Sequence, residues 1–452
     1  MSAWPLESTR LGIEIPRPSG PLAICLGAFG AAAALGVGMH STLLVVIAAA
    51  AAAGLAIVRA PEFLVVLFAC QGTLKSLPPF TASPVDLLIV SFVLCGVACA
   101  VRIYRDGLPR IPLASVLMLV VSGLLVVAAL RTVVPGATYK AINFEIVGSA
   151  LLFMPLILVR DTKALARLAL GFVIVGIMVA LAATPSGDPS EPLIIPGGDE
   201  ITAALFPAFG GLAAISCLAM RCRGIQRLLL LALGIVLLGA SVRAGSRGVL
   251  LSMGIAVIAA LVLLIYHSRR RQVIVSAILI ALASLVVIGP AVETAVRGSI
   301  DPAALKRYTH LTTDRRRAYL HSRALDQAFA HPLGVGVGTY GVNLPVLQPR
   351  PAVPYPHNVI YETFDESGIF AVGALVALML TGLAAALKTA WRPGCAFCAV
   401  GLVFGLSEAF ASGSVADDPL LWMTIGISMG IVGGFAERGS GARADDDEAL
   451  VA

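Results

Sequence analysis

The sequence has very little charge. Charged residues make up 13% of its 452 residues, whereas hydrophobic residues make up 58%. Because soluble domains usually carry about 25% charged residues, we find no segment with the composition of a water-soluble domain. The mean hydropathy of +0.93 and the repeated uncharged apolar runs instead predict membrane-crossing helices, each of which needs about 20 apolar residues.

The sequence also lacks a convincing pattern for a metal or redox site. Only Cys395 and Cys398 have CxxC spacing, and because both lie in an apolar stretch we interpret them as packing residues. No predicted outside loop contains an Asp-x-Asp pair, and the adjacent Asp417 and Asp418 are expected to cap a helix. No cleavable signal peptide is evident, since the first 20 residues are polar. We therefore expect no cofactor and no metal ion.

The apolar stretches predict an all-α polytopic membrane bundle of 12 to 14 transmembrane helices. Two of the fourteen candidates, the third and the sixth, are the weakest, which leaves 12 helices as the lower count. The candidate spans lie near residues 21–38, 41–58, 61–74, 86–101, 111–130, 143–159, 164–183, 201–220, 226–242, 248–266, 272–291, 359–387, 394–411 and 419–436.

The distribution of lysine and arginine predicts the orientation of the bundle. Most of the 32 basic residues lie in alternate connections and in the two ends of the chain, and an excess of such residues marks cytoplasmic segments. We therefore expect a cytoplasmic N-terminus at residues 1–20 and a cytoplasmic tail at residues 437–452. Helices 1–11 would occupy residues 21–291, a long outside loop residues 292–358, and helices 12–14 residues 359–436.

The long outside loop is basic, unlike the other predicted outside loops. Residues 315–330 have helical spacing, with Tyr319, Ala324, Leu325 and Phe329 able to share one face. A basic amphipathic helix on a membrane surface suits lipid phosphates, so membrane lipids are expected partners. We favour an anion site in this loop over an ordinary solvated loop, because the other outside loops are neutral or acidic.

Three sequence motifs map to the same predicted outer face. The first is SVRAGSRG at residues 241–248, between two spans. Arg243 and Arg247 would be costly at the membrane edge unless they meet anions, and arginine pairs bidentately with phosphate. Ser246 is placed to cap the following helix. The alternative is a tight turn whose arginines extend to the membrane surface.

The second and third motifs follow the amphipathic helix. The stretch HPLGVGVGTY at residues 331–340 does not follow a strand, so we expect it to end that helix and turn the chain back, with His331 structural. In the stretch from Tyr355 to Gly368, His357 and Asn358 open the next helix. A histidine at this position can accept a proton near neutral pH.

The three motifs in this order resemble the O-antigen ligase and O-unit polymerase superfamily of membrane glycosyltransferases. The resemblance covers residues 240–380 most closely. In that family the second motif typically reads HPLxGxGxGxF/Y and the third HNxxLexxxexGixG. Glu362 and Gly368 fit the family spacing, whereas Asp365 has no assigned counterpart. Each motif is weak alone, and the order of all three carries the identification.

The resemblance implies a metal-independent, inverting glycosyltransferase whose donor is a glycan on undecaprenyl diphosphate. An acceptor hydroxyl would attack the anomeric carbon, with His357 as the catalytic base. The resemblance places diphosphate-binding side chains and supporting residues in this sequence as well. The former are Arg243, Arg247, Arg316 and Arg317, and the latter are Asn358, Glu362 and Ser246.

The motifs leave the acceptor open. An O-antigen ligase acts on the lipid A core, a polymerase on another lipid-linked glycan, and an O-oligosaccharyltransferase on a protein. A flippase for lipid-linked glycans and a structural scaffold are less favoured, because the long loop divides the spans unequally and little charge is buried within them. The expected location is the bacterial inner membrane, with the active face periplasmic and no nucleic acid as partner.

Overall fold

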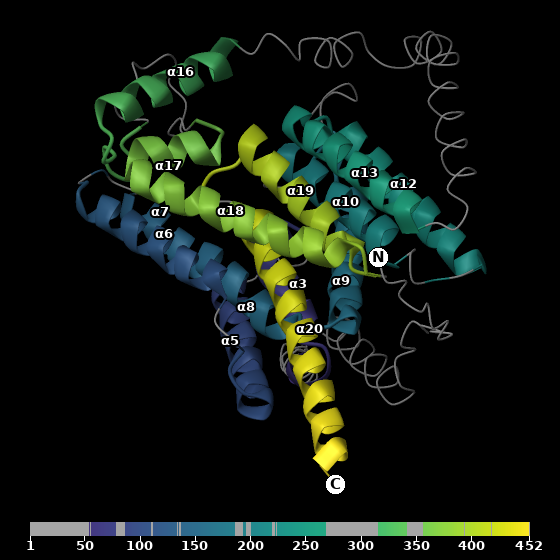
Figure 1. The fold of residues 1–452 in the computed structure, drawn as a ribbon. Coiled ribbons are helices and arrows are strands. Elements are labelled where there is room, and N and C mark those ends of the chain that lie inside the picture. The colour runs from purple at the N-terminus through teal and green to yellow at the C-terminus, as the bar shows by residue number, and fades with distance from the viewer. Residues whose placement is uncertain are drawn as a thin grey trace, which may run out of the picture.

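In the computed structural model the chain is a bundle of helices (Figure 1). The structure describes residues 54, 56–77, 86–109, 112–132, 134, 137–185, 193–195, 200–218, 222, 224–267, 315–340, 356–392, 394–416 and 418–451. Strands within these residues are limited to the antiparallel pair β1 (Thr184–Pro185) and β2 (Leu193–Ile194).

The helices carry the labels of Figure 1 and have the following bounds. They are α3 (Glu62–Ala69), α4 (Gln71–Lys75), α5 (Leu87–Asp106), α6 (Leu113–Leu130), α7 (Ala137–Asn143), the π-helical turn η2 (Phe144–Ser149), α8 (Ala150–Leu158), α9 (Thr162–Ala182), α10 (Glu200–Ala213), the π-helical turn η3 (Ala214–Leu218), α12 (Gly224–Ala244), α13 (Arg247–His267), α16 (Arg315–Ala330), α17 (Val359–Ser367), α18 (Ile369–Ala390), α19 (Ala396–Ala411) and α20 (Pro419–Val451).

Eight helical segments in the described part of the chain are long and apolar enough to cross a membrane, and two shorter apolar helices accompany them. The eight are Leu87–Asp106, Leu113–Leu130, Thr138–Leu158, Thr162–Ala182, Glu200–Cys217, Gly224–Ala244, Ile369–Ala390 and Pro419–Ala436, and the two are Arg247–Leu263 and Ala396–Ala411. The predicted all-α membrane bundle is confirmed. The predicted spans 21–38 and 272–291, and nearly all of 41–58, lie outside the described residues.

Small residues and aromatic rings pack the helices together. A Cβ atom at Gly210 of α10 would lie 2.7 Å from the carbonyl oxygen of Phe172 on α9, so the two backbones touch. The ring of Phe209 lies 4.8 Å from that of Phe172 and 5.2 Å from that of Phe397. Because lipid tails are as apolar as leucine, such close packing rather than exclusion of water holds membrane helices together.

The structure divides two predicted spans. The segment 61–74 forms two short helices, α3 and α4, which meet at Cys70. The segment 359–387 is interrupted at Gly368, whose φ of 85° and ψ of −178° are suited only to glycine. The short helix α17 precedes this break, and the membrane-length helix α18 follows it. The predicted cytoplasmic tail continues α20 as helix to Val451.

The amphipathic helix predicted at residues 315–330 is confirmed as α16. Its buried stripe consists of Leu320, Ala324 and Ala328, and it packs against α17 (Figure 1). Of the four residues predicted to share one face, Ala324 is buried and Phe329 is 71% exposed. Residues four apart lie one above the other on a helix, and here the 320–324–328 row faces the protein.

Candidate active site

The start of α17 is fixed by the side chain of Asn358, which caps the helix. Oδ1 of Asn358 accepts hydrogen bonds from the backbone N–H groups of Ile360 and Tyr361, at 3.0 and 3.2 Å. Nδ2 of the same side chain donates to the carbonyl oxygen of Phe410, at 3.0 Å. One asparagine therefore satisfies the first turn of α17 and also ties it to the end of α19.

His357 stands immediately before this cap and has an unusual backbone. Its φ of 55° lies in the left-handed region, and among the described residues no other non-glycine residue has a positive φ. Histidine tolerates this region better than most residues, and such conformations gather at functional sites. The side chain is half-buried. Its backbone lies between the buried Pro356 and the Asn358 cap.

The end of α19 also holds Arg317, one of the predicted diphosphate-binding residues. We call residues 408–418 the α19–α20 turn. Nη1 of Arg317, on α16, donates to the carbonyl oxygen of Ala411 at 3.0 Å, one residue after the carbonyl bound by Asn358. The last carbonyl groups of a helix have no partner within it and favour cations. The C-terminus of α19 therefore anchors both α16 and α17.

The first motif forms the tight connection between α12 and α13. Gly245, with a φ of 86°, turns the chain, and the carbonyl of the buried Ser246 accepts the N–H of Leu250 at 3.0 Å. Arg243 is exposed in the last turn of α12, and Arg247 is half-buried as the first residue of α13. The two arginines therefore lie in one short turn, residues 243–248, which we call the arginine turn.

This arginine turn also packs against the α19–α20 turn. A Cβ atom at Gly248 would lie 2.8 Å from Oγ of Ser412, so only glycine allows the approach without a shift. One helical turn further, Oγ of Ser252 donates to Oε2 of Glu408 at 3.3 Å, and Ser412 donates to the other oxygen of Glu408. Motifs far apart in the sequence thus meet at one turn.

Residues 228–376, which contain all three motifs, match the profile of a protein family described as O-antigen ligase. This segment is similar to the O-antigen ligase family. The resemblance inferred from the order of the motifs is therefore confirmed, and it places a membrane glycosyltransferase domain in the chain. No curated protein matches the sequence.

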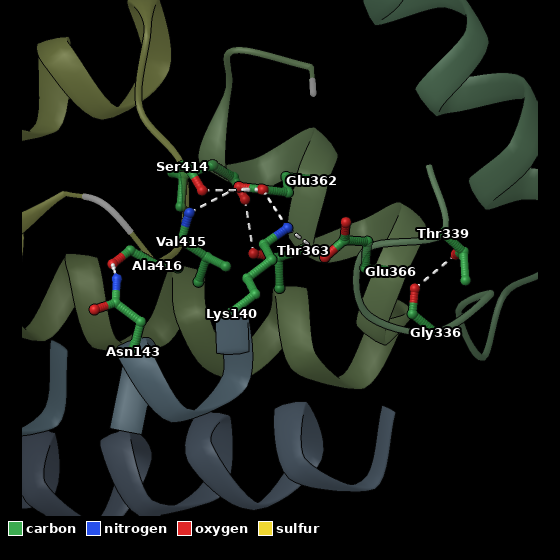
Figure 2. Close-up of polar contacts among 11 residues, drawn as sticks. Lys140, Asn143, Gly336, Thr339, Glu362, Thr363, Glu366, Ser414, Val415 and Ala416 are labelled. Carbon is green, nitrogen blue, oxygen red and sulfur yellow. Dashed lines mark hydrogen bonds and ion pairs between the residues drawn. The ribbon is translucent and has the colours of Figure 1, made fainter. Parts of the chain in front are cut away.

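A buried ion pair connects the O-antigen ligase domain to helices on either side of it in the sequence (Figure 2). Nζ of Lys140 lies 2.5 Å from Oε1 of Glu362 and 2.6 Å from Oε2 of Glu366. Glu362 also accepts hydrogen bonds from Oγ of Ser414, at 3.0 Å, and from the backbone N–H of Val415, at 2.7 Å. These contacts hold α7, α17 and the α19–α20 turn in one arrangement.

This cluster contains more carboxyl groups than cations. Asp365 is fully buried, and neither of its carboxylate oxygens has a hydrogen-bond partner within the described residues. Burial raises the pKa of Asp365 to about 7, and the neighbouring Glu366 carboxylate adds to the rise. Burial likewise raises the pKa of Glu366 to about 7, against the opposing effect of Lys140. The second half of α17 therefore holds protons near neutral pH.

The glycine-rich motif returns the chain from α16 to the end of α17, as the sequence predicted. The backbone N–H groups of Val335 and Gly336 donate to the carbonyls of Asp365 and Glu366, at 2.9 and 3.0 Å. A Cβ atom at Gly334 would lie 2.5 Å from the carbonyl oxygen of Glu366. His331 is exposed, so the second motif of the O-antigen ligase domain packs its glycines rather than its histidine against α17.

The structure brings most of the predicted site residues to one place. Arg317, Asn358 and the arginine turn all contact the α19–α20 turn. The side chain of Arg316 lies outside the described part of the chain. The predicted role of Glu362 was to orient His357, whereas its hydrogen bonds in the structure join Lys140, Ser414 and Val415.

The motifs gave no indication of Lys140 or of the α19–α20 turn. Lys140 is a single cation before an apolar run, the usual pattern of a helix boundary. The α19–α20 turn is short and made mainly of small residues. Its visible signals are Glu408, a carboxylate in an apolar stretch, and the predicted cap at Asp417 and Asp418.

Proposed function

We propose that the protein transfers a glycan from undecaprenyl diphosphate to a hydroxyl group on the core of lipid A, as an O-antigen ligase. The observation that supports this most directly is that Arg317, the arginine turn and Asn358, the residue next to His357, all contact the α19–α20 turn. A polymerase of lipid-linked repeats is the alternative. It uses the same donor and the same chemistry and differs in the acceptor.

The arginines would hold the diphosphate of the donor. A leaving diphosphate gains negative charge as its bond to the sugar breaks, and positive charge fixed in advance stabilises that state. Arg243, Arg247 and Arg317 come from two sides of one turn, and Arg316 is adjacent on α16. Guanidinium groups pair with phosphate oxygens through two parallel hydrogen bonds, so this set suits a diphosphate without a metal ion.

His357 would accept the proton. The acceptor oxygen attacks the anomeric carbon as the bond from that carbon to the diphosphate oxygen breaks, so the configuration inverts. The diphosphate leaves with the bonding electron pair, and the hydroxyl proton passes to the imidazole. Asn358 would support this step by fixing the backbone beside His357. Ser246 would shape the arginine turn, and Glu362 would hold α17 against the α19–α20 turn.

The test compares His357→Ala with His331→Ala in purified protein. A general base contributes about 10²–10⁴-fold to the rate, so His357→Ala should lose most glycan transfer but still gain thermal stability from the lipid-linked donor. His331→Ala should keep its transfer rate per folded molecule. Transfer by His357→Ala at a near wild-type rate would remove His357 from the mechanism. Activity that is lost on chelation and restored by magnesium or manganese would refute the arginine-only scheme.

Product analysis separates the two acceptors. A ligase yields lipid A core carrying the glycan, whereas a polymerase yields longer glycans on undecaprenyl diphosphate. We further propose that the site faces the periplasm from the inner membrane, with both termini cytoplasmic. A cysteine introduced at the exposed Ser322 should then react with an impermeant thiol reagent on intact spheroplasts, and one at Arg105 should not. The opposite labelling pattern would invert the topology.

A further inference from the structure

A cavity of about 380 Å³ lies at the same end of the bundle as the candidate active site. Its walls are α4, the adjoining α7 and η2, the first turns of α10, and the α19–α20 turn. The volume falls within the range of about 300–1,000 Å³ that is usual for small-molecule sites. The motif residues His357, Arg243, Arg247 and Arg317 are not among its described lining residues, so it is a separate compartment.

The lining of this cavity suits hydroxyl groups and not phosphates. Among the described residues that line it, none is lysine, arginine or histidine. Gln71 and Asn143 supply side-chain amides, Thr202 and Ser414 supply hydroxyls, and Glu408 and Asp418 supply carboxyl groups. Because no described lining residue is a cation that could balance these groups, an anionic ligand would be repelled by them. Amides, hydroxyls and carboxylates are the groups that donate to and accept from sugar hydroxyls.

The cavity shares a wall with the proposed reaction centre. Ser412 lines the cavity and also contacts Gly248 of the arginine turn. Ser414 lines it as well and donates to Glu362 of α17 at 3.0 Å. The opposite wall is held in place by Asn143, whose Nδ2 donates to the carbonyl of Ala416 at 3.0 Å (Figure 2). A molecule in the cavity would therefore lie against the turn that anchors Arg317 and Asn358.

We infer that this cavity binds an uncharged sugar of a glycan substrate, next to the bond that is made or broken. The inference rests on the proposed glycosyltransferase function and adds to it a saccharide site distinct from the arginines. The neutral sugar could belong to the acceptor glycan or to the donor glycan, because both carry the hydroxyl groups that the lining recognises. Oligosaccharides prepared from each of them distinguish these two sources.

The first arm measures binding without activity. Thr202→Cys in lipid nanodiscs, which contain no sugar detergent, is labelled with a small maleimide. The probes are core oligosaccharide freed from lipid A by mild acid, the oligosaccharide released from the lipid-linked donor, and glucuronate as an acidic sugar. We expect one neutral-sugar probe to slow labelling and glucuronate to have no effect. Labelling of the exposed Ser322→Cys should not change with any probe. Equal labelling of Thr202→Cys with every probe would overturn the inference.

The second arm measures kinetics with Gln71→Leu. Loss of one hydrogen bond to the sugar should raise the KM for one substrate by about tenfold and leave kcat nearly unchanged. Gln327→Leu on α16, away from the cavity, is the matched control and should change neither. A kcat loss at unchanged KM would contradict a binding role. If a sugar probe protects Thr202→Cys from labelling but the wild-type protein transfers no glycan, the proposed function fails and the saccharide site stands.

Discussion

Lys140 is the cation of the buried cluster, and its replacement by methionine would leave Glu362 and Glu366 without their partner. The two carboxylates are 1% and 3% exposed and lie 2.5 and 2.6 Å from Nζ. Removal of one partner from a buried ion pair typically costs about 3–5 kcal/mol, because the remaining charge is buried without compensation. We therefore expect Lys140→Met to lower the unfolding free energy by about this amount.

The loss should depend on pH with a definite sign. In Lys140→Met the folded state holds Asp365 and Glu366 in their protonated form, because burial raises both pKa values and the opposing effect of Lys140 is lost. Their contribution to stability is therefore retained at low pH and lost as the pH rises. Thermal unfolding in nanodiscs should show a larger deficit at about pH 8 than at about pH 6. Glu366→Gln added to Lys140→Met should restore part of the stability.

A matched pair elsewhere provides the control. The half-buried Arg167 and the buried Glu62 form an ion pair between α9 and α3, at 2.7 Å, remote from the motifs. Arg167→Met should also lower stability, but glycan transfer per folded molecule should persist. Lys140→Met should lose transfer as well, because α17 is no longer held against the α19–α20 turn. A Lys140→Met protein as stable as the wild type at both pH values would refute the reasoning.

Three further predictions follow from single positions. Arg247→Lys keeps the charge but loses the planar fork, so it should express normally and lose much of its transfer activity in the liposome assay. Gly368→Ala should fail to accumulate on immunoblots, since its Cβ would lie 2.5 Å from the backbone of Leu333, whereas Gly373→Ala, in open space, should be at least as stable as the wild type. The wild type should lose stability as the pH rises through about 7, because Asp365 and Glu366 bind protons more tightly when folded; Asp365→Asn should reduce that slope in pH-dependent melting curves.

The parts of the fold that depend on local pattern could be predicted from the sequence. Helix α16 has the predicted bounds because its spacing and its flanking residues both favour a helix. The seven described cysteines, Cys395 and Cys398 among them, are buried, as their apolar surroundings indicated. Asp418 accepts from the N–H of Leu421 at 3.3 Å at the start of α20, which confirms the predicted cap.

The parts that depend on long-range contacts could not be predicted. Nothing in the sequence near Lys140 indicates that its partners lie more than 200 residues further on. The hydropathy pattern also did not predict the division of the 359–387 span. Helix α17 buries its acidic residues against other helices, and its composition alone does not indicate this burial. Glu362 was placed in the site by its spacing from His357, and only the packing of α7 and the α19–α20 turn shows which groups it contacts.

The position of the α19–α20 turn in the chain has a consequence for biosynthesis. Asn143 and Ala416 are 273 residues apart in sequence, and the carbonyls that anchor Arg317 and Asn358 belong to α19, which the ribosome makes after all three motifs. A nascent or truncated chain that ends before residue 408 therefore carries every motif but lacks the turn that gathers them. The candidate site cannot assemble until α19 and this turn have been synthesised.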